Sequence, residues 1–211
     1  MSTTIGLLIF DRVEELDFVG PWEVFTMARE AGADLRAVTI APIGGPGGGG
    51  VRCAKGLRVI ADHGFADAPK LDVLLVPGGD GARPLATNEL VLGWIRDTAR
   101  DCRWVASVCT GALLLAASGV AAGRAVCTHW AFADTLAARG DVAVLRGRRF
   151  HQDGNIVTAA GVSAGIDMAL WLTGRLCGDA VARATQKYME YDPAPPYDIA
   201  GWMPPDHVAE A

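Results

Sequence analysis

The sequence predicts an α/β protein of the flavodoxin-like kind, a three-layer sandwich with a mostly parallel central sheet and helices on both faces. Short apolar runs alternate with amphipathic segments, which is the β-α-β pattern of a parallel sheet. Hydrophobic residues make up 51% of the 211 residues and charged residues 20%, as is typical of a globular chain. We expect a single domain, with its core at about residues 4–191 and a proline-rich tail at 192–211.

Five apolar runs bounded by Gly, Pro or Asp predict the strands. They scarcely alternate with polar residues, which is typical of strands buried on both faces. They are residues 4–10, 35–41, 71–77, 103–108 and 154–161. Parallel sheets of this class bind ligands outside the carboxyl ends of their strands, so chemistry is expected in the segments that follow these runs.

Apolar residues at three- and four-residue steps predict the helices. They are residues 20–32, 88–100, 162–178 and 180–191, together with a short helix after Cys109. The glycine-rich stretch 44–51 lacks the Lys-Ser/Thr of a phosphate loop, so it predicts a surface turn.

Charge and cysteine spacing exclude several classes of function. The 19 basic and 24 acidic residues give a net charge of −5, and no basic run offers a nucleic-acid surface. The N-terminus has neither a basic region before its short apolar run nor a membrane span, so we expect a cytoplasmic protein. Five cysteines without CxxC spacing predict free thiols and no metal, because Cys127 and His129 would make only two ligands.

Cys109 stands where a β-forming run meets a helix-forming run. The segment Ser107 to Gly111 has the small-x-nucleophile-x-small outline of a strand-to-helix elbow, which exposes its central side chain. Unpaired N–H groups at a helix start favour a thiolate, so we expect a reactive thiol. The alternative is that Cys109 is a small buried core residue, as free cysteines often are.

Two other segments follow predicted strands and offer groups for catalysis. Gly78 and Gly79 come directly after a strand, where glycine N–H groups are able to form an oxyanion hole, although a tight turn explains them too. Asp17 lies between Leu16 and Phe18. An apolar setting would raise its pKa and let it carry a proton, whereas in isolation it would serve as a helix cap.

In this order, the acidic "EELD", then "PGG", then "SVCTGA" and then "THW" resemble the DJ-1/PfpI (ThiJ/PfpI) superfamily over about residues 4–196. Within the superfamily, four segments resemble the isocyanide (isonitrile) hydratases. They are "ELDFVGP", "SVCTGALLLAASGVAAGRAVCTHWAF", "DGNIVTAAGVSAGIDMAL" and "MEYDPAPPY".

The resemblance implies roles for individual residues. Cys109 matches the nucleophile, Asp17 the acidic residue, and Thr110 the neighbour that is a histidine in proteolytic relatives. The backbone donors would be Gly78, Gly79 and Thr110. Gly161 and Val162 match a segment that closes over the thiol, and His129 either orders the site or is an ordinary core residue.

The implied reaction hydrates an isocyanide to an N-substituted formamide through a thioimidate on Cys109, as a hydro-lyase in reverse and without metal or organic cofactor. An apolar substrate needs an apolar pocket. Candidates to line it are Phe18, Trp22, Phe132 and Trp202, all of which fit core or interface positions equally well. The resemblance also implies a homodimer.

Two other functions fit the same residues. A related enzyme would act on glyoxals or on glycated thiols and amines through Cys109, and it would need a polar pocket. The amidotransferase-like N-terminal domains of AraC-type regulators share "SVCTGALLLAASG" and "THW". The basic recognition helix of such regulators has no counterpart in this sequence, so we expect an enzyme, with a small-molecule or redox sensor as the alternative.

Overall fold

The computed structural model describes residues 2–44 and 50–197. Its main sheet has the strand order β10-β11-β7-β6-β1-β2-β5. The β10–β11 pair is antiparallel and the other pairs are parallel. The strands are β1 (Thr3–Leu8), β2 (Leu35–Ala41), β5 (His63–Gly64), β6 (Val73–Val76), β7 (Trp104–Val108), β10 (Phe150–Asp153) and β11 (Ile156–Ala159).

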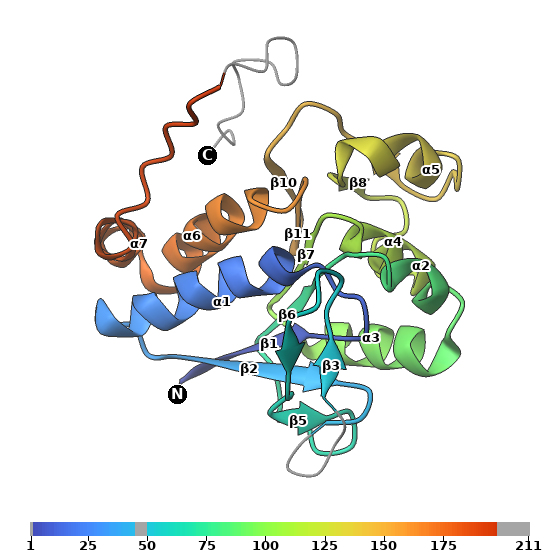
Figure 1. The fold of residues 1–211 in the computed structure, drawn as a ribbon, viewed down its shortest axis with the longest axis horizontal. Coiled ribbons are helices and arrows are strands. Elements are labelled where there is room, and N and C mark those ends of the chain that lie inside the picture. Colours follow the sequence, from blue (N-terminus) through green and yellow to red (C-terminus); the bar gives the residue numbers. More distant parts are fainter. Residues whose placement is uncertain (1, 45–49, 198–211) are drawn as a thin grey trace.

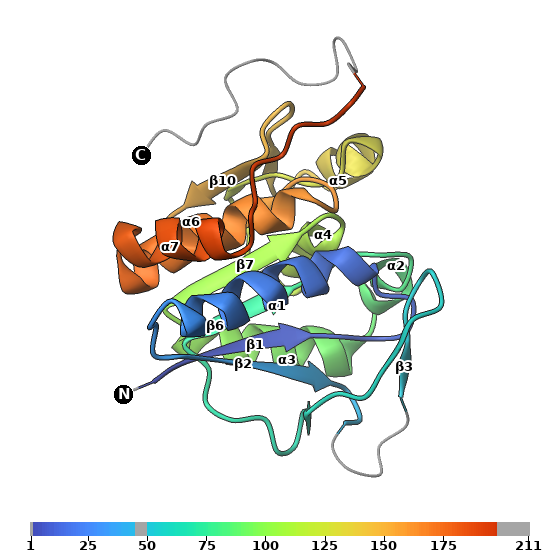
Figure 2. The same cartoon turned by 60° about the vertical axis from the view of Figure 1, so that its left-hand side comes forward.

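Helices cover both faces of this sheet, which confirms the predicted three-layer class (Figures 1 and 2). One layer holds α1 (Glu15–Glu30), α6 (Ala164–Cys177) and α7 (Asp179–Tyr188), which pack on one another. The other holds α2 (Ala82–Leu85), α3 (Glu89–Asp101) and α4 (Gly111–Ala117). The 3₁₀ turn η1 (Trp130–Phe132) leads into α5 (Ala133–Ala137).

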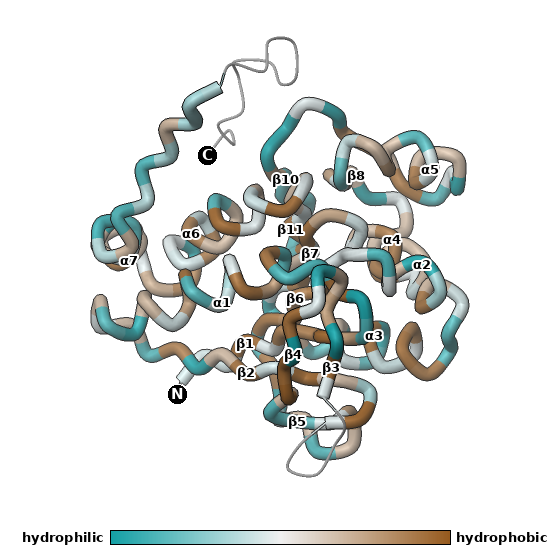
Figure 3. Tube along the Cα trace, in the orientation of Figure 1, coloured by the Kyte–Doolittle hydropathy of each residue, from teal (hydrophilic) through white to brown (hydrophobic). Residues whose placement is uncertain are grey.

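The hydrophobic core lies between the helical layers, along the central strands (Figure 3). All four residues of β6 and of β11 are buried, as the unbroken apolar runs predicted. The outer layer is polar by comparison: α7 buries only Thr185 among its residues. The helix α3 is capped by Asn88, whose side chain accepts hydrogen bonds from the N–H groups of Leu90 and Val91.

Helix α1 begins five residues earlier than predicted, at Glu15 rather than at residue 20. The sequence "GP" suggested a helix start because proline is favoured in the first turn and loses a hydrogen bond further in. Here Pro21 lies inside the helix, and close packing compensates. A Cβ on Gly20 would stand 3.0 Å from Cγ1 of Ile166, and one on Gly165 would stand 3.3 Å from Cγ of Pro21, so α1 and α6 approach closely there.

Two small two-stranded sheets were not predicted. The hairpin of β3 (Val51–Arg52) and β4 (Arg58–Val59) is antiparallel, and β8 (Ala125–Val126) pairs in parallel with β9 (Ala143–Val144). Strands of two residues are too short to leave a periodic signal in the sequence. Most of the predicted glycine-rich turn, residues 45–49, and most of the proline-rich tail, residues 198–211, lie outside the described residues.

The strand order places a topological switch point between β1 and β6. From β1 the chain moves to β2 on one side and later returns to β6 on the other. The crevice outside the carboxyl ends of these strands is the expected place for a ligand. No helix in residues 2–44 and 50–197 is long and apolar enough to cross a membrane.

Candidate active site

Three predicted site segments meet at this switch point. Asp17 lies in the first turn of α1, Gly78 follows β6, and Cys109 follows β7. A Cβ on Gly78 would stand 2.4 Å from the N atom of Thr110 and 3.0 Å from Oδ2 of Asp17. The position therefore has room only for glycine, and this is why the three segments come so close together.

Cys109 forms the elbow between β7 and α4. Its φ of 58° is unusual for a residue other than glycine and costs roughly 1–3 kcal/mol. Its N–H donates to the carbonyl of Ala160 at 2.7 Å, and its carbonyl accepts from Oγ1 of Thr128 at 2.9 Å. These bonds fix the strained backbone, and the predicted elbow is thereby confirmed in geometry.

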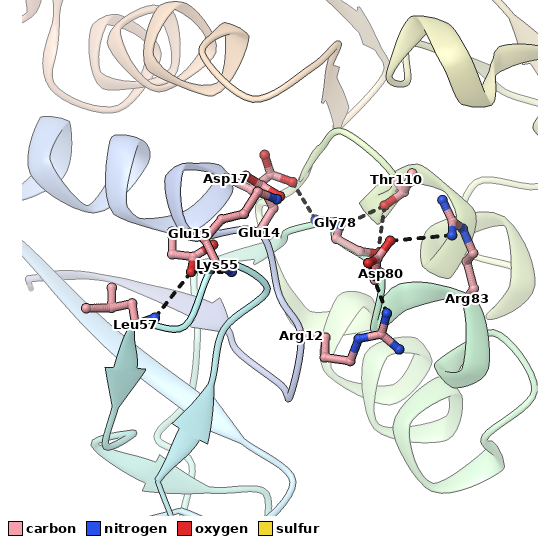
Figure 4. Close-up of polar contacts among 11 residues, drawn as sticks. Arg12, Glu14, Glu15, Asp17, Lys55, Leu57, Gly78, Asp80, Arg83 and Thr110 are labelled. Carbon is pink, nitrogen blue, oxygen red and sulfur yellow. Dashed lines mark hydrogen bonds and ion pairs between the residues drawn. The ribbon is translucent and has the colours of Figure 1, made fainter.

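Asp17 is completely buried. Its Oδ2 accepts a hydrogen bond from the N–H of Gly78 at 2.9 Å (Figure 4). Its Oδ1 is also buried and has no hydrogen-bond partner among the described residues. A carboxyl oxygen of this kind is costly for stability, so it is a candidate for chemistry rather than for packing.

The N–H groups of Gly78 and Gly79, which we expected to form an oxyanion hole, donate hydrogen bonds to side chains of the protein. The N–H of Gly78 is used by Asp17, and the N–H of Gly79 donates to Oγ1 of Thr110 at 2.9 Å. The Thr110 hydroxyl in turn donates to the carbonyl of Gly79 at 3.3 Å. These backbone groups therefore orient two side chains, and Gly79 adopts a φ of 113° to do so.

Burial raises the pKa of both ionisable groups, Asp17 and Cys109. Desolvation, assisted by the charge of Glu14, raises the pKa of Asp17 to about 7, although hydrogen bonds from the Gly78 N–H and the Cys109 side chain oppose the shift. Desolvation and the nearby Asp17 raise the pKa of Cys109 to about 12. The N–H groups of Thr110 and Val162 act on the thiol in the opposite direction and are outweighed.

Burial therefore outweighs the effect of the helix start, which by itself favours a thiolate. The sequence showed the helix start but not the burial, and Cys109 is only 7% exposed. The folded protein instead holds a neutral thiol beside a carboxyl group that changes protonation near neutral pH.

Lys55 is a neighbour of the site that the sequence did not indicate. It comes from the turn of the β3–β4 hairpin, and its Nζ lies 2.7 Å from Oε2 of Glu14 (Figure 4). Its N–H donates to Oε1 of Glu15 at 2.7 Å. No local pattern joins residues forty positions apart, so only the fold reveals this counter-charge.

His129 packs against the loop after β11. A Cβ on Gly161 would stand 2.6 Å from Cδ2 of His129, so the glycine allows the ring to approach. The Nδ1 atom of His129 accepts the N–H of Ala131 at 3.2 Å, which places the ring proton on Nε2. Burial lowers the pKa of His129, which favours the neutral ring. Val162 contacts the thiol through its N–H and has a φ of 41°, which is strained for a β-branched residue.

The four aromatic residues proposed to line a substrate pocket differ in their burial. Phe18 and Phe132 are buried in the core, and Trp22 is half-buried against it. Trp202 lies outside the described residues. Their contact with a substrate stays a prediction.

A cavity of about 410 Å³ opens beside the loop that follows β11, and this loop contacts Cys109. It shares Thr128 and the segment Ala160 to Val162 with the surroundings of Cys109. Its size is within the range of small-molecule sites. The remaining lining residues are His129, Trp130, Ala133, Leu145, Arg146, Gly147, Arg148, Arg149, Ser163 and Ala164.

The cysteines are free thiols. Cys53, Cys102 and Cys127 are buried, and Cys177 is partly exposed. Within the described part of the chain, no group of three or more His, Cys, Asp or Glu residues is arranged to hold a metal ion.

A cysteine elbow beside a buried carboxyl group, at the carboxyl edge of a parallel sheet, defines a class of α/β protein. Residues 3–174 match the model of the DJ-1/PfpI family, and the chain belongs to this family. It is 39% identical to the isonitrile hydratase of Pseudomonas putida over 94% of this chain and 82% of that protein.

Two further similarities agree with this family assignment. The chain is 33% identical to the Parkinson disease protein 7 homolog of Danio rerio over 80% of this chain and 87% of the homolog. The structure resembles the crystal structure of a ThiJ/PfpI family protein from Pseudomonas syringae, with a TM-score of 0.84, 29% identity, and coverage of 95% of this chain and 79% of that one.

Proposed function

We propose that this protein is an isocyanide hydratase, which converts R–N≡C and water to an N-substituted formamide. The observation that carries the proposal is the pairing of Cys109 with Asp17, a buried carboxyl group with one unpartnered oxygen and a pKa of about 7. The 39% identity to an isonitrile hydratase supports the choice of substrate.

In the first step, Asp17 acts as general base toward a neutral thiol. The Asp17 carboxylate takes the proton of Cys109 as Sγ attacks the terminal carbon of the isocyanide, and a C–S bond forms. Asp17 then delivers the same proton to that carbon. The product of this step is the thioimidate R–N=CH–S–Cys109, with Asp17 again ionised.

In the second step, water replaces the sulfur. Asp17 removes a proton from water as the water oxygen adds to the thioimidate carbon, and Asp17 then delivers this proton to the nitrogen and is ionised again. The C–S bond then breaks, the hydroxyl proton returns through Asp17 to Sγ, and R–NH–CHO leaves. The thiol and the carboxylate are regenerated, so one water is consumed in each cycle.

The test is a comparison of two electrophiles. The purified protein is given cyclohexyl isocyanide, with formamide followed by mass spectrometry, and separately methylglyoxal, with its consumption followed. We expect formamide turnover and little loss of methylglyoxal. Consumption of methylglyoxal without formamide would instead favour the glyoxalase-like alternative for the same thiol.

A further inference from the structure

The cavity beside the thiol has an uneven distribution of charge. Three arginines, Arg146, Arg148 and Arg149, line it within four residues of chain between β9 and β10, and none of its lining residues is acidic. The rest of its wall includes the apolar side chains of Ala133, Leu145 and Ala164. The cavity therefore combines an apolar wall with a cationic segment.

Two of the three guanidinium groups are already neutralised. Arg149 forms a two-point ion pair with Asp167 and contacts Oγ of Ser163 at 3.3 Å. Arg146 is paired with Asp134. Such pairs hold the side chains in place and leave little charge for a ligand.

Arg148 differs from its neighbours. Its side chain is exposed, and no acidic residue pairs with it in the described part of the chain. Burial is the main cause of the lowered pKa of His151, and the charge of Arg148 lowers this pKa further. The cavity wall also includes Ser163 and Ala164 at the N-terminus of the 14-residue helix α6, which adds a positive dipole end.

We propose that the cavity binds isocyanides that carry a carboxylate remote from the isocyano group, and that Arg148 recognises this carboxylate. The inference rests on the proposed function. Cys109 itself does not line the cavity, but the wall segment Ala160 to Val162 lies next to it, so a ligand anchored at Arg148 would extend along the apolar wall toward the thiol. Arg148 acts as a specificity residue and takes no part in proton transfer.

The first test measures binding without turnover. Calorimetry compares 4-(formamidomethyl)benzoate, the product of such a substrate, with the neutral 4-(formamidomethyl)benzamide. We expect the carboxylate to bind about tenfold more tightly, a preference that Arg148→Gln removes and that weakens with salt. Arg183→Gln is the matched control, because Arg183 is an exposed arginine on α7 that lines a different surface depression.

The second test separates this proposal from the proposed function. With 4-(isocyanomethyl)benzoate, Arg148→Gln is expected to raise KM about tenfold with kcat within about twofold, and to leave turnover of benzyl isocyanide unchanged. Hydration of both isocyanides with equal KM, or a preference that survives Arg148→Gln, would overturn the carboxylate site and leave the hydratase intact. No hydration of either isocyanide, with the binding preference retained, would support the anion site and reject the hydratase.

Discussion

At the scale of single residues, the burial of Asp17 sets its protonation. Its carboxyl group is fully buried and accepts a hydrogen bond from the Gly78 N–H, with the Cys109 side chain beside it, and burial raises its pKa to about 7. The desolvation that makes the ionised carboxylate unfavourable in the folded protein also brings the pKa of Asp17 near 7, where a general base works best.

The pH dependence of activity should report this group. In the proposed mechanism the ionised form of Asp17 takes the thiol proton, so kcat/KM for an isocyanide should rise with pH through about 7 and reach a plateau above it. In Asp17→Asn the residual rate should be at least about a hundredfold lower and should lack this limb. A wild-type profile that is flat from pH 5 to 9 would contradict the assignment.

The stability should also depend on Asp17. In the unfolded chain its pKa is the ordinary 3.8, whereas in the folded protein it is about 7, so folding retains a proton between these values. The contribution of this proton to the free energy of unfolding is full below about pH 4, and it is lost as the pH rises to about 7. At about 1.4 kcal/mol per pH unit, the loss is roughly 4 kcal/mol.

Urea unfolding of the wild type and of Asp17→Asn across pH 4 to 8 measures this loss of stability. We expect the difference in unfolding free energy to shift in favour of the variant over that window, and to stay constant above about pH 7. A difference that does not change with pH would mean that Asp17 has an ordinary pKa in the folded protein.

At the scale of elements, the junction of β7 and α4 depends on a small residue after the elbow. A Cβ on Gly111 would stand 2.0 Å from the carbonyl oxygen of Val76, which is a backbone atom that has no room to move. We expect Gly111→Ala to destabilise the protein by at least about 2 kcal/mol.

Gly93 provides the matched control, because it lies within α3 and the nearest atom to a Cβ there is Nη2 of Arg96 at 3.8 Å. Gly93→Ala should therefore stabilise the protein by about 0.5–1 kcal/mol. Thermal unfolding of the two variants compares them directly. Similar melting temperatures would show that the elbow tolerates a larger residue.

The elements that were predicted well are those that the core dictates. Unbroken apolar runs became β1, β6, β7 and β11, because strands covered on both faces need apolar residues throughout. The start of α1 was misplaced because packing against Gly165 overrides the local effect of Pro21.

The site was predictable to the extent that its residues follow strand ends. Cys109, Asp17 and Gly78 do so, and the structure brings them together. The neutral state of the thiol and the approach of Lys55 depend on burial and on contacts between distant segments, which periodicity does not encode. The use of the Gly79 N–H by Thr110 is a contact of the same kind.

At the scale of the whole molecule, we expect a homodimer. Leu16 on α1 and Leu57 beside β4 are exposed large apolar residues, and the N–H of Leu57 contacts Oε1 of Glu15, the residue before Leu16. Ile60 is exposed one residue after β4. Exposed apolar patches of this kind mark interaction surfaces.

Light scattering during size-exclusion chromatography tests the dimer, with an expected mass of twice 22.1 kDa. Leu16→Glu should shift the protein toward the monomer, because a charge in an apolar interface is costly. Leu90→Glu is the control, since Leu90 is also an exposed leucine, at 67% against 37% for Leu16, but lies on α3 in the opposite layer. A monomeric wild type at micromolar concentration would exclude the dimer.

Formamide production by Cys109→Ala, measured beside the wild type, shows whether Cys109 carries the chemistry. Mass spectrometry first confirms that Cys109 is reduced, and Cys177→Ala serves as the control because it removes a partly exposed thiol away from the elbow. We expect the wild type and Cys177→Ala to hydrate cyclohexyl isocyanide, and Cys109→Ala to show no turnover while keeping the wild-type melting temperature. Turnover by Cys109→Ala at a rate near that of the wild type would contradict the account.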